Sequence, residues 1–87
     1  MFDVRKSPAR LTSGQAVVGS AWIDPFEFTH THPLLSIDRQ IAFFCVHGHE
    51  VSQFACALAR LHGRDAVYVR GGFEALRKAG APLEGIA

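Results

Sequence analysis

The stretch that decides the fold is QIAFFCVHGHEVSQFACALARLHG, from Gln40 to Gly63. It begins with a β-prone apolar run, QIAFFCV, which is typical of a strand buried on both faces. From Glu50 the period becomes helical, and Gly63 supplies a helix stop. The residues with helical spacing are Val51, Phe54, Ala55, Leu58, Leu61 and His62. The sequence therefore places Cys45 where a strand passes into a helix.

Strand and helix signals flank this stretch on both sides. Upstream, a polar lead-in with a short helix or turn after Pro8 precedes a predicted strand, SAWID, which Pro25 ends. A polar and aromatic connector with one helical turn follows. Downstream, residues 66–69 form a predicted strand closed by Gly71 and Gly72, and residues 73–79 form a short helix. This alternation predicts an α/β domain with a small, mostly parallel central sheet and helices on both faces. The aromatic residues expected in the core are Trp22, Phe43, Phe44 and Phe54.

Length and composition restrict the class of protein. With 87 residues, 48% of them apolar, the chain suits a single small domain over residues 1–87. Its 9 basic and 8 acidic residues are scattered, which argues against nucleic acid as a partner. We see no signal peptide and no apolar run of membrane-spanning length. Two cysteines are too few for a disulfide scaffold, so we expect a soluble, cytoplasmic protein with free thiols.

The loop after the buried strand has the features of a thiol site. In parallel sheets, sites gather at the carboxyl ends of the strands, where Asp24, Cys45 and the Gly71–Gly72 pair fall. Backbone N–H groups of a tight loop and of a helix N-terminus favour a thiolate, and Gly48 supplies the freedom for a sharp return. The alternative is that Cys45 is a buried, inert residue at a strand end.

The order of these elements resembles the second half of a rhodanese-like domain. That family places its catalytic cysteine on a loop between a buried strand and a helix, followed by a strand, a glycine pair, a short helix and Gly-x-Pro. Cys45, residues 66–69, Gly71–Gly72, FEALRKAG and Gly80–Ala81–Pro82 match this order. Upstream, AWIDPFEF resembles the family's Ile-Asp strand end, with Asp24 as the matching acid. The resemblance covers roughly residues 21–83.

Three departures from the family pattern stand out. Glu50 occupies the place five residues after the cysteine where the family often has arginine, and Phe26 occupies another arginine position. The usual Gly-His-Ile-Pro-Gly-Ala segment is not found, so the resemblance implies a shortened member. We expect Glu50 to disfavour thiosulfate, a dianion, as the donor.

The resemblance implies a sulfurtransferase without a cofactor. Cys45 would take a sulfane sulfur from thiosulfate, polysulfide or a persulfide and pass it to a thiol or to cyanide. The loop that would hold the terminal sulfur comprises Val46, His47, Gly48, His49, Glu50 and Val51. Asp24 would either orient this loop or cap its own strand end. Arg70, beside Gly71, would either replace the loop arginine or remain a surface charge.

Other readings of the same residues stay open. The first is a non-catalytic sensor or interaction domain with a reactive thiol. The second is a zinc or copper module built from Cys45 and the pairs His30/His32 and His47/His49, although no acid or second cysteine has a standard ligand spacing, and we predict no metal. A Cys-x5-Arg phosphatase is disfavoured because Val51 stands six after Cys45. Cys56 is predicted to be structural.

Overall fold

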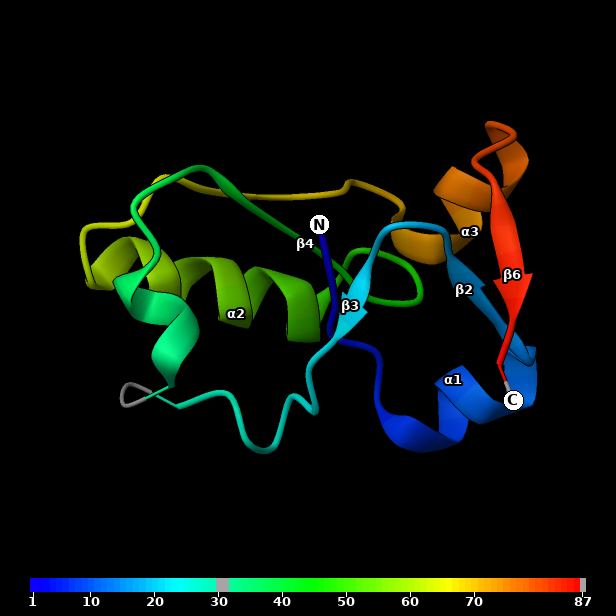
Figure 1. Cartoon of the computed structure of the whole chain (residues 1–87), viewed down its shortest axis with the longest axis horizontal. Coiled ribbons are helices and arrows are strands. Elements are labelled where there is room, and N and C mark those ends of the chain that lie inside the picture. Colours follow the sequence, from blue (N-terminus) through cyan, green and yellow to red (C-terminus); the bar gives the residue numbers. More distant parts are fainter. Residues whose placement is uncertain (30–31, 87) are drawn as a thin grey trace.

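The structure, a computed structural model, describes residues 1–29 and 32–86 (Figure 1). The elements are, in chain order, β1 (Phe2–Asp3), α1 (Ser7–Ser13), β2 (Gln15–Val17), β3 (Ala21–Trp22), the 3₁₀ turn η1 (Pro33–Ser36), β4 (Ile41–Phe44), α2 (Glu50–Leu61), β5 (Ala66–Tyr68), α3 (Gly72–Lys78) and β6 (Leu83–Gly85). The α/β prediction is confirmed: the predicted strands are present with shorter bounds, and the helix predicted over residues 73–79 spans Gly72–Lys78. No helix in the described ranges is long and apolar enough to span a membrane.

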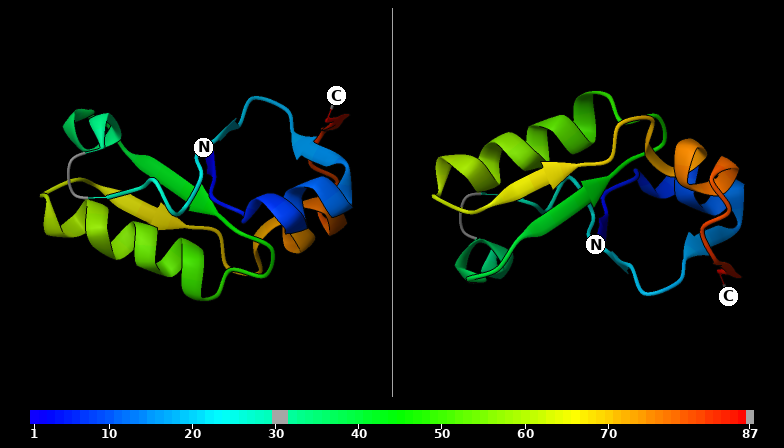
Figure 2. Two further views of the ribbon diagram at one scale, coloured as in Figure 1. Left: turned by 90° about the horizontal axis from the view of Figure 1, so that it is seen from below. Right: turned by 90° about the horizontal axis from the view of Figure 1, so that it is seen from above.

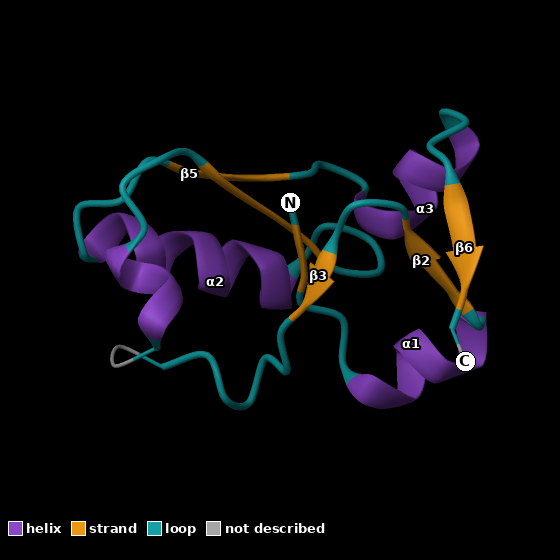
Figure 3. Cartoon of the chain, viewed as in Figure 1, coloured by secondary structure: helices purple, strands orange, loops and turns teal. Residues whose placement is uncertain are grey.

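The central sheet has four strands in the order β3-β1-β4-β5, and each neighbouring pair is parallel. Strands β2 and β6 form a separate antiparallel pair, which lies beside α1 and α3 (Figures 1 and 3). Because the sheet is parallel, the carboxyl ends of all four strands meet at one edge. This edge is where a site is expected.

The sequence interpretation missed the strand at the centre of this sheet. β1 lies between β3 and β4, and residues Asp3, Val4 and Arg5 are almost fully buried where a polar lead-in was expected. A strand of two residues has no period to detect, and its flanking Asp and Arg resemble surface residues. The antiparallel pair β2–β6 was missed for the same reason, since each of its strands has three residues.

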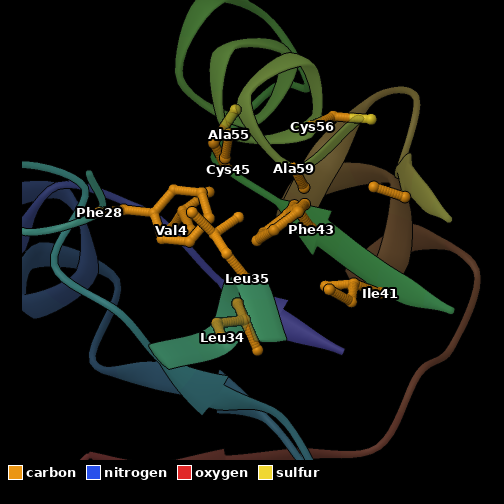
Figure 4. Close-up of a cluster of buried hydrophobic side chains, with 11 residues drawn as sticks. Val4, Phe28, Leu34, Leu35, Ile41, Phe43, Cys45, Ala55, Cys56 and Ala59 are labelled. Atoms are coloured by element: carbon orange, nitrogen blue, oxygen red, sulfur yellow. The ribbon is translucent and has the colours of Figure 1, made fainter. Parts of the chain in front are cut away.

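The core lies on both faces of β4. Phe43 packs on the α2 side in a cluster with Val4, Ile41 and Leu35 (Figure 4). Phe44 points the other way and packs against Phe73 of α3. The prediction of a strand buried on both faces is therefore confirmed, with helices α2 and α3 on opposite sides of it.

The buried face of α2 overlaps only in part with the face that the apolar pattern indicated, since Ala55 is buried and Val51 and Leu58 pack against the core. Its buried residues are Ser52, Ala55, Cys56 and Ala59. Phe54 is 64% exposed and Leu61 is 82% exposed, so the expectation that Phe54 belongs to the core is wrong. Trp22 is also partly exposed, and its indole N–H donates to the carbonyl of Arg5. Small residues let the helix axis approach the sheet, and this close approach outweighs burial of the larger side chains.

A buried ion pair joins the central strand to its surroundings. Asp3 and Arg5 are each 1% exposed, and Arg5 Nε and Nη2 donate to the Asp3 carboxylate over 2.8–3.1 Å. Arg5 also donates to the Gln15 carbonyl over 2.7 Å and to Ser13 Oγ over 2.9 Å. Its guanidinium lies 4.1 Å from the centre of the Phe73 ring. One side chain thus contacts β1, the end of α1, β2 and α3.

Replacing Asp3 with alanine should destabilise the fold strongly. The Asp3→Ala variant leaves the Arg5 guanidinium buried without its counter-ion, which costs about 3–5 kcal/mol of unfolding free energy. Urea denaturation followed by circular dichroism measures this loss. The matched control is Asp38→Ala, because Asp38 is exposed and lies 4.0 Å from Arg64 in a surface pair. Equal midpoints for the two variants would contradict the role given to the Asp3–Arg5 pair.

Candidate active site

The thiol of Cys45 lies at the carboxyl edge of the sheet, directly after β4. In the register of the sheet, Phe44 is the partner of Asp3, and the Val4 N–H donates to the Phe44 carbonyl over 2.9 Å. The ends of the two central strands therefore bring Cys45 and Arg5 to one cavity, of about 390 Å³. Cys45 is 6% exposed, so the sulfur is sheltered yet reachable from this cavity.

The loop between β4 and α2 is locked against the start of α3 (Figure 2). The N–H of Phe73 donates to the Cys45 carbonyl over 2.7 Å, and that of Glu74 donates to the Val46 carbonyl over 3.2 Å. Gly48 and Gly72 both have positive φ, and a Cβ on Gly72 would lie 2.6 Å from the Gly48 nitrogen. Only glycine fits at these two places. The first carbonyls of the loop therefore face α3, which leaves its later N–H groups free to turn toward the sulfur.

Hydrogen bonds to the sulfur favour its ionised form. Burial raises the pKa of the Cys45 thiol, but hydrogen bonds from the Ser52 side chain and from the backbone N–H groups of Ser52, Gly48 and His49 outweigh it, so the net pKa is lowered. The Ser52 hydroxyl lies 3.1 Å from Cys45 Sγ. Gln53 Nε2 donates to the Gly48 carbonyl over 3.0 Å, which helps to hold the loop in this orientation. The site is a small cradle of hydrogen-bond donors that stabilises the ionised form of the Cys45 thiol.

Most of the loop residues named from the sequence do surround the thiol. Val46, His47, His49, Glu50 and Val51 line the cavity with Cys45. Gly48 is buried beneath it and contributes its N–H. The rings of His47 and His49 are exposed, with centroids 6.2 Å apart.

The sequence interpretation missed four residues of the site. Ser52 is the third residue of α2, where a helix still has free N–H groups and a hydroxyl can turn back toward the preceding loop. A serine seven residues after Cys45, in the first turn of the predicted helix, is a sequence signal from which this contact could have been predicted. Arg5, Lys6 and Ala9 form the opposite wall of the cavity, and they come from the part of the chain in which β1 went unrecognised.

Of the three supporting residues proposed from the sequence, Gly71 packs against the loop, whereas Asp24 and Arg70 do not line the cavity. Asp24 accepts a hydrogen bond from the Phe26 N–H over 3.0 Å, which is the strand-end cap that was one of its two readings. The buried acid at a strand end beside the site is Asp3. Arg70 is exposed and does not line the cavity, whose arginine is Arg5. Gly71, with φ of 83°, is the N-cap of α3 and packs close to Gly48.

Cys56 and the histidine pairs make no second site in the described part of the chain. Cys56 is a free thiol on the buried face of α2, and desolvation there raises its pKa, which disfavours the thiolate. No group of three or more His, Cys, Asp or Glu side chains among residues 1–29 and 32–86 could hold a metal ion. His30 lies outside the described residues, so its proposed pairing with His32 is not described.

Solved structures with the same fold extend over nearly the whole chain. A rhodanese-related protein from Thermoplasma volcanium is 25% identical with a TM-score of 0.79, and the match covers 95% of this chain and 80% of that one. A protein of unknown function from Rhodopseudomonas palustris, a possible tyrosine phosphatase, is also 25% identical, with a TM-score of 0.78 and coverages of 95% and 68%. A thiosulfate sulfurtransferase from Pseudomonas aeruginosa is 21% identical, with a TM-score of 0.76, and this chain matches 16% of its length. No family model and no curated protein matches the sequence. The rhodanese fold expected from the sequence is confirmed.

Removing the Ser52 hydroxyl should raise the pKa of the Cys45 thiol. In Ser52→Ala the thiolate loses one of the hydrogen bonds that stabilise it, so at neutral pH a smaller fraction of Cys45 is ionised and alkylation by iodoacetamide slows. The measurement is the alkylation rate against pH, in a Cys56→Ser background.

The control for this experiment is Ser36→Ala, which removes an exposed hydroxyl that donates to the Pro33 carbonyl. This variant should titrate like the parent. A Ser52→Ala profile that coincides with the control would show that the hydroxyl does not stabilise the thiolate.

Proposed function

We propose that this chain, a rhodanese-like domain, is a sulfurtransferase that carries a sulfane sulfur on Cys45. The observation that supports this most directly is the surroundings of the sulfur: a sheltered thiol with a lowered pKa, N–H donors from Gly48, His49 and Ser52, and a cavity in front of it. A persulfide is an anion at neutral pH, and fixed backbone dipoles stabilise an anion without a metal or a cofactor.

The reaction proceeds in two balanced half-reactions. The Cys45 thiolate attacks the outer sulfur of a donor R–S–SH, forming a Cys45–S–SH persulfide, while the donor S–S bond breaks and its electron pair leaves with R–S⁻. The enzyme persulfide rests as the anion Cys45–S–S⁻, having given its proton to water, and it takes a proton back from water as an acceptor thiolate attacks its outer sulfur. That S–S bond breaks, its electron pair returns to Cys45, and the acceptor leaves as a persulfide. Double-displacement kinetics follow from this order.

Phosphate-ester chemistry is less well supported by the same site, although one structural neighbour is a possible tyrosine phosphatase. A phosphoryl group needs a cation to balance its charge. Arg5 is the arginine that lines the cavity, and most of its N–H donors are already directed at Asp3, Ser13 and Gln15. A persulfide carries a single negative charge and does not need a cation of this kind.

The first test follows sulfur on the intact chain. Incubation with a sulfane-sulfur donor should add the mass of one sulfur atom, and cyanide should remove it as thiocyanate. Cys45→Ser should abolish both steps, because a hydroxyl is not ionised at neutral pH. Cys56→Ser, the matched control, should keep both because its thiol is buried in the core. Sulfur on Cys56 alone would contradict the proposal, whereas loading without unloading would indicate the sensor function.

The second test concerns the charge at the mouth of the cavity. Glu50 is exposed there and repels a thiosulfate dianion, so Glu50→Arg should raise kcat/KM for thiosulfate by about fivefold or more relative to a persulfide donor. Glu84→Arg, the same charge change on the separate strand β6, should leave this ratio unchanged. If the ratio of kcat/KM for thiosulfate to kcat/KM for the persulfide donor does not rise in Glu50→Arg, Glu50 does not select the donor.

A further inference from the structure

A second hollow of about 290 Å³ adjoins the cavity of Cys45. It is lined by Lys6, Pro25, Phe26, Glu50, Val51 and Phe54. Lys6, Glu50 and Val51 also line the first cavity, so the two hollows share a wall. We call the second hollow the aromatic annex. A molecule whose sulfur reaches Cys45 can therefore extend into it.

Two phenylalanine side chains that line the annex are exposed to solvent. Phe26 is 77% exposed and Phe54 is 64% exposed, although burial of such a ring is favourable. They come from different segments, the turn after β3 and the outer face of α2. With Pro25 and Val51 they give the annex an apolar lining at the entrance to a polar site.

The size of the annex indicates what it can hold. A closed apolar cavity of about 150 Å³ is enough to bind benzene. The annex is larger than this and open, so it has room for one aromatic ring or a short alkyl chain. A stable contact with another protein buries about 800 Å² on each partner, which is far more than two rings and a proline offer. The occupant that fits is one arm of a small molecule.

The charges on the shared wall restrict the link between that arm and the sulfur. Lys6 and Glu50 stand on this wall with opposite charges, and the Lys6 ammonium lies 6.0 Å from the centre of the Phe26 ring. A charged link of either sign would be repelled by one of these side chains and attracted by the other, so neither sign of charge is favoured. An uncharged link meets neither repulsion.

We propose that the aromatic annex binds the apolar arm of a small thiol or persulfide that exchanges sulfur with Cys45, and that Phe26 and Phe54 determine this specificity. The proposal rests on the sulfurtransferase function proposed above. In the step concerned, the acceptor thiolate R–S⁻ attacks the outer sulfur of Cys45–S–SH and leaves as R–S–SH, and Cys45 regains its thiolate. The arm R in the annex holds the attacking sulfur in line with the bond that breaks.

The test compares two acceptors that differ in the arm. The persulfide form of the protein is mixed with benzyl thiol or with 2-mercaptoethanol, and kcat/KM is measured for each. In Phe26→Ala and Phe54→Ala the ratio of benzyl thiol to 2-mercaptoethanol should fall about tenfold, the effect of losing one apolar contact in a pocket. Leu61→Ala is the matched control, since Leu61 is an exposed residue of the same helix outside the annex.

A second measurement does not depend on sulfur transfer. Benzyl alcohol, an unreactive analogue of the thiol, is titrated into the Cys45→Ser protein and followed by amide NMR shifts. Shifts at Phe26, Val51 and Phe54 that disappear in Phe54→Ala support the annex even if no sulfur is transferred. No such shifts, or an unchanged acceptor ratio in both variants, would overturn the proposal. A lower molecular mass for Phe54→Ala than for the parent protein in analytical ultracentrifugation would also overturn it. That result would show that a second copy of the chain covers the rings.

Discussion

The buried Asp3–Arg5 ion pair is the constraint on which the rest of the structure depends. A guanidinium that is 1% exposed must have its N–H donors satisfied, and here they are met by Asp3, Ser13 and Gln15. These partners belong to the central strand, the end of α1 and the start of β2. Satisfying one charge therefore fixes the path of the first part of the chain around the carboxyl edge of the sheet. The same arginine lines the cavity of Cys45, so the ion pair also fixes the position of one wall of the site.

The cradle around the thiol is built almost entirely from the backbone. The carbonyls at the start of the loop accept hydrogen bonds from α3, and the later N–H groups turn toward the sulfur. The close approach of Gly48 and Gly72 makes this possible. Such a cradle stabilises one negative charge on the sulfur without supplying a mobile cation. In the function proposed above, this favours a singly charged persulfide over a phosphoryl group.

The packing of α2 connects the fold to the surface beside the site. Ala55, Cys56 and Ala59 face the sheet, which lets the helix lie close enough for Ser52 to reach the sulfur. With these residues facing the sheet, Phe54 lies on the exposed side of α2, where it lines the aromatic annex together with Phe26. Val51 and Leu58 still pack against the core, whereas Phe54 and Leu61 are exposed.

The sequence by itself determined the α/β alternation, the strand of residues 41–44, the bounds of α2 and the position of Cys45 between them, because these depend on local periodicity and on glycine stops. It also identified the loop of residues 46–51. It did not reveal β1, since a strand of two residues has no period, nor the exchange of Asp24 for Asp3 as the buried acid beside the site. The inward face of α2 and the parts played by Ser52 and Arg5 likewise depend on distant partners. Only the tertiary structure decided these, because burial and hydrogen bonding are settled between segments that local pattern does not connect.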